Sequence, residues 1–199
     1  MAGENPNLSE LLSSRICHDI VSPLGAIGNG MELLLMTGTE SGPEITLILD
    51  SITNANARVR LFRIAFGLAR ADQFVDSKQA RAIFDDIGRT GRIKIDWHIT
   101  DRVPRQDAKL AMLAFLCLET ALTGGGHVSM DRVQGNWLVS ASAEKINVDS
   151  TLWETLDAGA ADRNLSAAHV QFALLADELA RRKRKIIAEF GDARMALRF

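Results

Sequence analysis

Apolar side chains recur at spacings of three and four residues along the first third of the chain, a pattern typical of amphipathic helices. One such stretch covers residues 8–36 and a second covers residues 44–70. The short segment between them is rich in glycine and ends in proline, both of which break helices. Because so short a connection makes consecutive helices antiparallel neighbours, we expect a helical hairpin.

Each predicted helix carries its apolar residues in one stripe, and the stripe of the second helix is a sustained heptad seam. More leucine and isoleucine side chains lie outside the stripes than a single hairpin can bury. We therefore expect a homodimer in which two hairpins form a four-helix bundle; the alternative is that the C-terminal domain covers the excess. The stripes consist of Ile16, Ile20, Leu24, Ile27, Met31 and Leu34 on the first helix and of Ile45, Ile48, Ile52, Ala55, Val59, Phe62, Phe66 and Ala69 on the second.

The pattern changes after Asp72, so we divide the chain into a hairpin domain, residues 1–72, and a second domain, residues 73–199. In the second domain we expect a mixed sheet with helices on one face, which makes the fold class α+β. Gln134-Gly135-Asn136 is predicted to be the turn of a hairpin, and Gly124-Gly125-Gly126 to lead from a helix into a strand. Helices are expected over residues 78–87, 110–122, 152–156 and 166–182, and strands over 93–99, 127–133, 137–143, 185–190 and 195–199.

Composition excludes several classes of protein. The chain has 199 residues, 47% of them hydrophobic and 24% charged, with a net charge of −2, which is ordinary for a globular protein and argues against a general nucleic-acid binder. The two cysteines, Cys17 and Cys117, cannot form a disulfide framework or a four-cysteine zinc site. No apolar run is long enough to cross a membrane and the N-terminus does not resemble a signal peptide, so we expect a cytoplasmic protein that contacts no membrane.

Two weaker features point to ordinary structural roles. His98, His127 and His169 share no spacing typical of metal ligands, so no metal site is expected. The basic run at residues 181–185 suits the C-terminus of a helix, where cations complement the helix dipole. Nucleic-acid binding by this run is the alternative, and it would weaken steeply with salt.

The first helix also carries a polar face opposite its apolar stripe. With 3.6 residues per turn, His18, Ser22, Gly25 and Asn29 all lie on the far side of the helix from Ile20. We therefore expect the His18 imidazole to face solvent among small side chains, within reach of a large partner.

The residues around this histidine, His18-Asp19-Ile20-Val21-Ser22-Pro23, resemble the phosphoacceptor box of two-component sensor histidine kinases. The longer stretch to Leu33 resembles the ChpT-like histidine phosphotransferases more closely. The resemblance implies that His18 accepts a phosphoryl group and that Asp19 orients its imidazole or accepts its proton. Ser22, one helical turn further on, is placed to hydrogen-bond the phosphoryl group.

A receiver domain carrying a phosphorylated aspartate is the partner that such a histidine implies. We expect Gly25 and Asn29 to keep the helix surface low for its docking. Arg15, and Arg60 and Arg63 on the second helix, are candidates to hold the phosphoryl group or the acidic receiver pocket, with solvated surface arginines as the alternative.

The order of elements in the second domain resembles the ATP-binding domain of the same kinases. The stretches that would hold magnesium and nucleotide lack the expected residues: residues 118–123 contain no asparagine, and residues 140–145 contain neither glycine nor aspartate. We therefore expect no cofactor bound by this chain and no autokinase activity. The resemblance implies that the receiver supplies Mg²⁺.

These observations predict a histidine phosphotransferase that shuttles a phosphoryl group through His18. The resemblance to ChpT-like proteins implies that the donor is the receiver domain of a hybrid kinase and that the acceptors are response regulators. Two alternatives remain. One is an ATP-dependent histidine kinase with a divergent nucleotide site, and the other is a dimeric scaffold that docks receivers without transfer.

Overall fold

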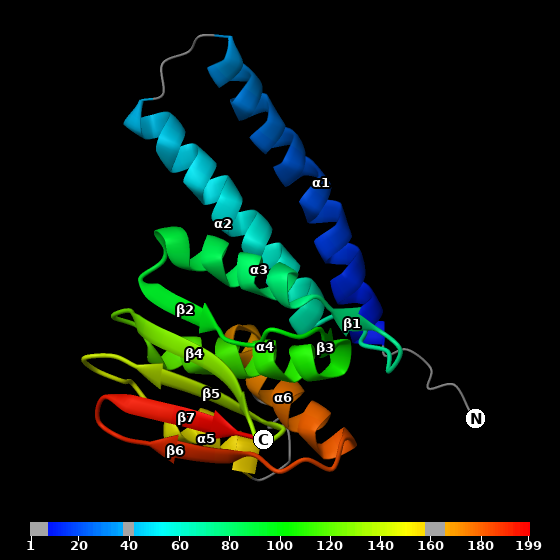
Figure 1. The fold of residues 1–199 in the computed structure, drawn as a ribbon, viewed down its shortest axis with the longest axis vertical. Helices are drawn as coiled ribbons and strands as arrows, with labels where there is room; N and C mark the ends of the chain where they lie inside the picture. The colour runs from blue at the N-terminus through cyan, green and yellow to red at the C-terminus, as the bar shows by residue number, and fades with distance from the viewer. Residues whose placement is uncertain (1–7, 38–41, 158–165) are drawn as a thin grey trace.

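The two helices predicted from the apolar periodicity form an antiparallel hairpin in the computed structural model (Figure 1), which describes residues 8–37, 42–157 and 166–199. Helix α1 spans Leu8–Met36 and helix α2 spans Pro43–Ala65. Proline suits the first turn of α2, where a backbone N–H has no partner within the helix. The prediction that this helix extends to Arg70 is wrong: it ends at Ala65, and the chain beyond it is bound by side chains of another helix.

The apolar stripe of α1 is divided between two environments. Cys17 is buried and Leu24 and Met31 are half-buried on the edge of the stripe that faces α2. Ile20 and Ile27, on the other edge, remain 42% and 52% exposed, and Ile16 and Leu34 beside them are equally open. The hairpin therefore buries only part of the predicted seam.

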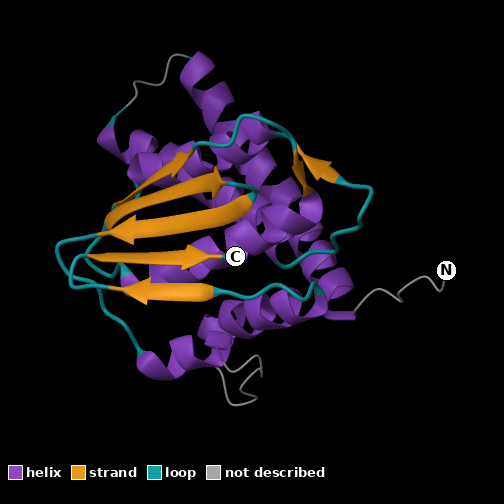
Figure 2. Ribbon diagram, turned by 60° about the horizontal axis from the view of Figure 1, so that its bottom comes forward, coloured by secondary structure: helices purple, strands orange, loops and turns teal. Residues whose placement is uncertain are grey.

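Residues 74–199 form the second part of the fold, a sheet in the order β2-β4-β5-β7-β6 with helices packed on one face (Figure 2). Strands β2 and β4 are parallel and the other pairs are antiparallel, so the sheet is mixed, as predicted. The elements are α3 (Ser77–Thr90), β2 (Ile93–Trp97), α4 (Arg105–Ala121), β4 (Gly126–Val133), β5 (Asn136–Ser142), α5 (Ser150–Asp157), a 3₁₀ turn η1 (Ala167–His169), α6 (Val170–Arg181), β6 (Ile187–Phe190) and β7 (Arg194–Arg198). Two short strands, β1 (Phe74–Val75) and β3 (Val103–Pro104), pair at the side.

Differences from the predicted boundaries have local causes. Helix α4 begins at Arg105, earlier than the predicted residue 110, because its first turn carries polar side chains that an apolar pattern does not reveal. Ser166 does not cap a helix N–H; its hydroxyl lies 3.2 Å from His169 Nδ1, and a 3₁₀ turn precedes α6. Strands β1 and β3 have two residues each, too few for alternation to be visible.

The predicted turns are confirmed by backbone conformations that favour glycine. Gln134 and Gly135 both have positive φ and form the two-residue turn between β4 and β5. Gly125, between α4 and β4, has a φ of +97°, and a Cβ atom there would lie 2.6 Å from the carbonyl oxygen of Arg92. The glycine cluster is thus a helix-to-strand turn.

The core lies between the sheet and its helices, and the opposite face of the sheet is polar. Trp97, Trp137 and Trp153 are all buried, and Phe84 packs against both Trp97 and Phe115. In the described part of the chain, no helix combines the length and the apolar character needed to cross a bilayer.

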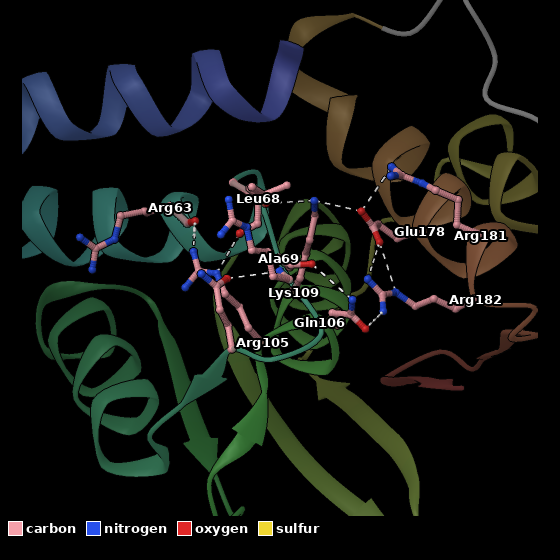
Figure 3. Close-up of polar contacts among 12 residues, drawn as sticks. Arg63, Leu68, Ala69, Arg105, Gln106, Lys109, Glu178, Arg181 and Arg182 are labelled. Carbon is pink, nitrogen blue, oxygen red and sulfur yellow. Dashed lines mark hydrogen bonds and ion pairs between the residues drawn. The ribbon is translucent and has the colours of Figure 1, made fainter. Parts of the chain in front are cut away.

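A set of polar contacts joins the hairpin to the second domain where α2 ends (Figure 3). Arg105 of α4 donates from Nε to the carbonyl oxygen of Leu68 at 3.0 Å and from a terminal nitrogen to that of Arg63 at 2.9 Å. The Gln106 amide donates to the carbonyl of Ala69. The Arg63 carbonyl lies in the last turn of α2, where carbonyls lack partners within the helix, and a cationic donor there also complements the negative end of the helix dipole. The carbonyls of Leu68 and Ala69 belong to the segment that follows the helix.

Lys109 extends these contacts into the core. Its ammonium donates to the carbonyl of Gly67 at 3.1 Å and lies 2.9 Å from Oε1 of Glu178 on α6, with both side chains almost fully buried. Arg182 donates to Oε2 of Glu178 and to the side-chain oxygen of Gln106. We call the contacts of Arg105, Gln106, Lys109, Glu178 and Arg182 the interdomain clamp.

Glu178 keeps its charge despite burial. Burial alone would raise the pKa of this carboxyl group, but Lys109 together with Arg182 and Arg181 lowers the pKa below its ordinary value of 4.5. A carboxyl with a lowered pKa in the folded state contributes stability above its unfolded pKa, and that contribution is lost as the pH falls through the folded-state pKa.

We predict that Glu178→Gln lowers the free energy of unfolding by about 3–5 kcal/mol at neutral pH, because it breaks the buried ion pair between Glu178 and Lys109. The variant should also lose less stability than the wild type when the pH falls below 4.5, the ordinary pKa of this group. Urea unfolding at several pH values measures both effects. Glu189→Gln, which removes an exposed pair with Arg198, is the control and should change stability by less than about 1 kcal/mol. Equal effects of the two substitutions would contradict this account.

Candidate functional site

The polar face predicted for α1 is exposed in the structure. The side chains of Arg15, His18, Ser22 and Asn29 are all exposed, and Gly25 lies half-buried among them. Helix α1 is continuous through Pro23, so these residues keep the helical spacing that the prediction assumed. The side chains of Asp19 and Pro23 lie outside the described part of the structure, and the role of Asp19 stays a prediction.

The direction in which the His18 side chain projects from α1 is set by the burial of its neighbour. Cys17 is buried, which turns the next residue outward. Burial raises the pKa of the Cys17 thiol, and the positive charge of Arg63 on α2 acts in the opposite direction. Arg63 is exposed and its charge acts on the residue next to His18, so the structure brings Arg63 to the level of the candidate phosphoacceptor.

Arg60 and Arg58 face the second domain instead. Arg60 contacts Asp86 of α3 at 2.5 Å, and Arg58 makes two hydrogen bonds to the carboxylate of Glu119 at the end of α4, at 2.8 and 2.5 Å. The bond to Glu119 raises the pKa of Arg58 more than burial lowers it. The predicted docking residue Arg60 is thus directed towards α3, and Arg63 is the α2 arginine that stays exposed.

Two glycines on α1 have no packing reason to be glycine. A Cβ atom built at Gly25 or at Gly30 would meet no atom within 4 Å. Glycine in a helix interior costs about 1 kcal/mol relative to alanine. At Gly25, on the face that carries His18, glycine therefore suits a surface that another molecule approaches closely, as expected from the sequence.

The region of the second domain that would correspond to a nucleotide site is bound up in internal contacts. Glu119 is paired with Arg58 of the hairpin. The Asn147 backbone N–H donates to the carbonyl of Ala121 at 3.0 Å, and its side chain donates to the hydroxyl of Thr123 at 2.6 Å. A hollow of about 480 Å³ remains beside these contacts, between Thr120, Asp149 and His169.

Two of the remaining histidines and the arginines of the basic run pair with carboxylates of the same chain. In the described part of the chain, no group of three or more histidine, cysteine, aspartate or glutamate side chains could hold a metal ion. His98 pairs with Asp131 and His127 with Asp96 on the polar face of the sheet. Within the basic run, Arg181 and Arg182 pair with Glu178, and Arg184 pairs with Asp107.

Sequence reasoning did not identify the residues that hold the hairpin in place. The Arg58–Glu119 pair and the interdomain clamp join residues that lie far apart in the chain. The sequence offered one indication of such contacts, which is a charged residue on a largely apolar helix. Lys109 and Glu178 each stand among apolar residues in α4 and α6. Such a residue predicts a buried polar contact, although not its partner.

Comparison with known proteins agrees with this geometry. A family model described as the histidine phosphotransferase C-terminal domain matches residues 77–194, more than half of the chain. The chain belongs to the histidine phosphotransferase family. It is 32% identical over 195 residues to the protein phosphotransferase ChpT of Brucella abortus (strain 2308), covering 94% of this chain and 92% of the relative.

Two solved structures match this histidine phosphotransferase to different degrees. One described as a bacterial phosphotransferase superimposes with a TM-score of 0.66 at 26% identity, covering 96% of this chain and 97% of the other. The histidine kinase AdeS of Acinetobacter baumannii is more distant, with a TM-score of 0.42 at 13% identity, covering 88% of this chain and 92% of the other. The α+β fold and the ChpT-like resemblance predicted from the sequence are confirmed.

We predict that Gly25→Ala raises the free energy of unfolding by about 0.5–1 kcal/mol, since alanine favours the helix and meets no neighbour. The same substitution should slow phosphoryl transfer if a receiver approaches this surface. Thermal unfolding and transfer rates, measured on one preparation, check both effects. Gly30→Ala, equally free of neighbours but three turns from His18, is the matched control. A Gly25→Ala variant that is more stable and transfers at the wild-type rate would show that this glycine has no docking role.

Proposed function

We propose that His18 is the phosphoacceptor of this histidine phosphotransferase in a multistep phosphorelay. A receiver domain of a hybrid histidine kinase would donate the phosphoryl group, and a receiver aspartate on a response regulator would accept it. The observation that carries the proposal is the exposure of His18 on a helix face of small and polar side chains, with buried Cys17 fixing its orientation.

The chemistry needs little from this chain beyond position. A nitrogen lone pair of neutral His18 attacks the phosphorus of the aspartyl phosphate; the P–N bond forms as the P–O bond to the aspartate breaks, and the carboxylate leaves. Asp19 would accept a hydrogen bond from the protonated ring nitrogen of His18. This bond would leave the other ring nitrogen, which carries the lone pair, to attack the phosphorus. Holding the two groups in line supplies much of the rate in phosphoryl transfer. We propose that Ser22 and Arg63, both exposed, contact the phosphoryl oxygens.

We propose further that transfer needs neither ATP nor a cofactor on this chain, with Mg²⁺ held by the acidic residues of the receiver. The commitment of Glu119 to Arg58 and of Asn147 to the end of α4 supports this proposal. Residues 118–123 resemble the stretch that holds nucleotide in the kinases, and here Glu119 of that stretch secures the hairpin instead.

We predict that His18→Ala abolishes transfer from a phosphorylated receiver, measured by following labelled phosphoryl groups between the purified proteins. His98→Ala, which removes another exposed histidine, is the control and should transfer at the wild-type rate. If both variants drain the receiver as fast as the wild type does, another residue accepts the phosphoryl group. Receiver binding without any transfer by the wild type would support a docking scaffold. Self-labelling with ATP and Mg²⁺ would instead indicate a kinase.

We propose a homodimer, and the exposed edge of the α1 stripe supports it. Ile16, Ile20, Ile27 and Leu34 recur along one line of the helix, and each is about half exposed in the single chain. Together with Leu47 and Ile48 on α2, they offer an apolar surface that a second hairpin would cover. A two-fold axis brings the same surface from both chains together and closes the assembly.

We predict that Ile20→Glu combined with Ile27→Glu converts a dimer to a monomer that stays folded, because both side chains are exposed in the single chain. Light scattering after size-exclusion chromatography gives the mass, and circular dichroism the fold. Val133→Glu, at an exposed apolar position on the β4–β5 hairpin, should leave the dimer intact. A wild-type protein that is monomeric at micromolar concentration would refute the dimer.

A further inference from the structure

Strand β6 forms one outer edge of the main sheet, since it pairs only with β7. Its backbone pairing alternates in a way that the structure defines. The Gly191 N–H donates to the carbonyl of Arg194 at 2.8 Å, so this pair is hydrogen-bonded, and alternation makes Glu189–Ala196 and Ile187–Arg198 hydrogen-bonded as well. The N–H and C=O groups of Ala188 and Phe190 therefore point away from β7, towards the open edge.

The same assignment follows independently from the other side of β7. Trp137 and Phe199 exchange both backbone hydrogen bonds, at 2.8 and 3.2 Å. Because hydrogen-bonded pairs recur at every second residue, the backbone amides of Leu197 and Met195 also point to β5. The amides of Arg198 and Ala196, between them, therefore point to β6. Both ends of the ladder thus place the outward groups of β6 at Ala188 and Phe190.

This edge lacks most of the features that usually protect an edge strand. Proteins protect exposed edges with proline, bulges, inward-pointing charges or a covering loop. Strand β6 has the sequence Ile-Ala-Glu-Phe, with Ile187 59% and Phe190 48% exposed. Its one charged residue, Glu189, is paired with Arg198 of β7. The edge therefore offers unpaired backbone groups flanked by apolar side chains.

A groove adjoins the start of the strand on the helix side of the sheet. It has a volume of about 360 Å³ and lies between α5, α6 and the segment that leads into β6. Trp153 of α5 contacts the Phe190 ring, so the helices extend beneath the strand. The lining residues are Leu156, Ala176, Leu179, Ala180, Arg184, Lys185 and Ile186.

The charge beside this edge is positive. Lys183 and Lys185, which precede β6, are exposed, and neither forms an ion pair with any residue in the described ranges. This separates them from Arg181, Arg182 and Arg184, which are paired with Glu178 or Asp107. Two exposed lysines without an ion pair in the described ranges favour a partner that carries acidic residues.

We propose that the β6 edge binds an extended acidic segment of another protein as an added strand. Its backbone would pair with Ala188 and Phe190, alternate apolar side chains would enter the groove beside Leu156 and Leu179, and its carboxylates would lie near Lys183 and Lys185. Main-chain pairing provides affinity in such complexes, and pockets for alternate side chains provide specificity. The site is built from the second domain alone and does not use His18.

The test is titration of the isotope-labelled full chain with a capped synthetic peptide of alternating valine and glutamate, followed by amide NMR. The peptide should bind saturably, with the largest shifts at the amides of Ala188 and Phe190. Ala188→Pro removes an outward N–H without touching the bonds to β7, since proline is tolerated at such an edge position. We expect it to weaken binding about tenfold, the loss of a main-chain hydrogen bond together with local crowding. Unchanged β7 signals would show that this variant is folded.

A charge test stands independently of the proline variant. Lys183→Glu combined with Lys185→Glu should weaken binding about tenfold, whereas Lys78→Glu combined with Lys94→Glu, which changes the net charge equally at distant exposed lysines, should not. A peptide of alternating valine and lysine should fail to bind.

Four results would overturn the proposal. They are the absence of saturable binding of the valine–glutamate peptide, equal binding of the valine–lysine peptide, binding of a single-stranded oligonucleotide in place of the peptide, and self-association that Ala188→Pro abolishes. The third result would assign the lysines to nucleic acid, and the fourth would assign the edge to a second copy of this chain.

Discussion

The geometry of this protein depends on how the last turn of α2 and the segment that follows it find partners for their carbonyl groups. Burying backbone carbonyl oxygens without hydrogen-bond donors is costly. Here Arg105, Gln106 and Lys109 of α4 donate to the carbonyls of residues 67–69, and Arg105 donates also to that of Arg63 in the last turn of the helix. The buried Lys109 ammonium lies 2.9 Å from Glu178, and Glu178 is held in turn by Arg182. One chain of charge compensation thus links α2, α4 and α6.

A consequence of the clamp is that the hairpin has a defined direction relative to the sheet. Arg58–Glu119 and Arg60–Asp86 add further contacts along α2, towards α4 and α3 respectively. Helix α1, by contrast, packs chiefly on α2, so most of its surface remains open. The second domain therefore acts on the candidate phosphoacceptor indirectly: it fixes α2, α2 fixes Cys17, and Cys17 sets the side of α1 from which His18 projects.

Local patterns in the sequence predicted most of this fold, and long-range polar contacts explain what they did not predict. Apolar periodicity identified the helices because burial repeats with the helical turn, and glycine at positive φ identified the turns at Gly125 and Gly135. The early end of α2 and the early start of α4 could not be seen in the same way. The first turn of α4 is polar and so escapes an apolar pattern, and the segment after α2 is held by Arg105 and Lys109 reaching carbonyls about 40 residues away, a pairing about which sequence spacing carries no information. The exposure of His18 was predictable because it needed only the helical wheel, whereas the direction of Arg60 depended on Asp86 in another element.

The cross-section of α1 explains how one helix could serve two partners without conflict. One edge of its apolar stripe, at Cys17 and Gly28, faces α2, and the other, at Ile20 and Ile27, is exposed. The polar face with His18 and Asn29 lies about 180° from Ile20 on the helical wheel. A second copy covering the isoleucines would therefore approach from the side opposite a receiver at His18. Such a division requires apolar residues that remain exposed in the single chain. It also requires glycines at positions where a larger side chain would fit. Helix α1 has both. These departures from the packing of a self-contained hairpin occur on its two outward surfaces, which is where contacts with other molecules would be made.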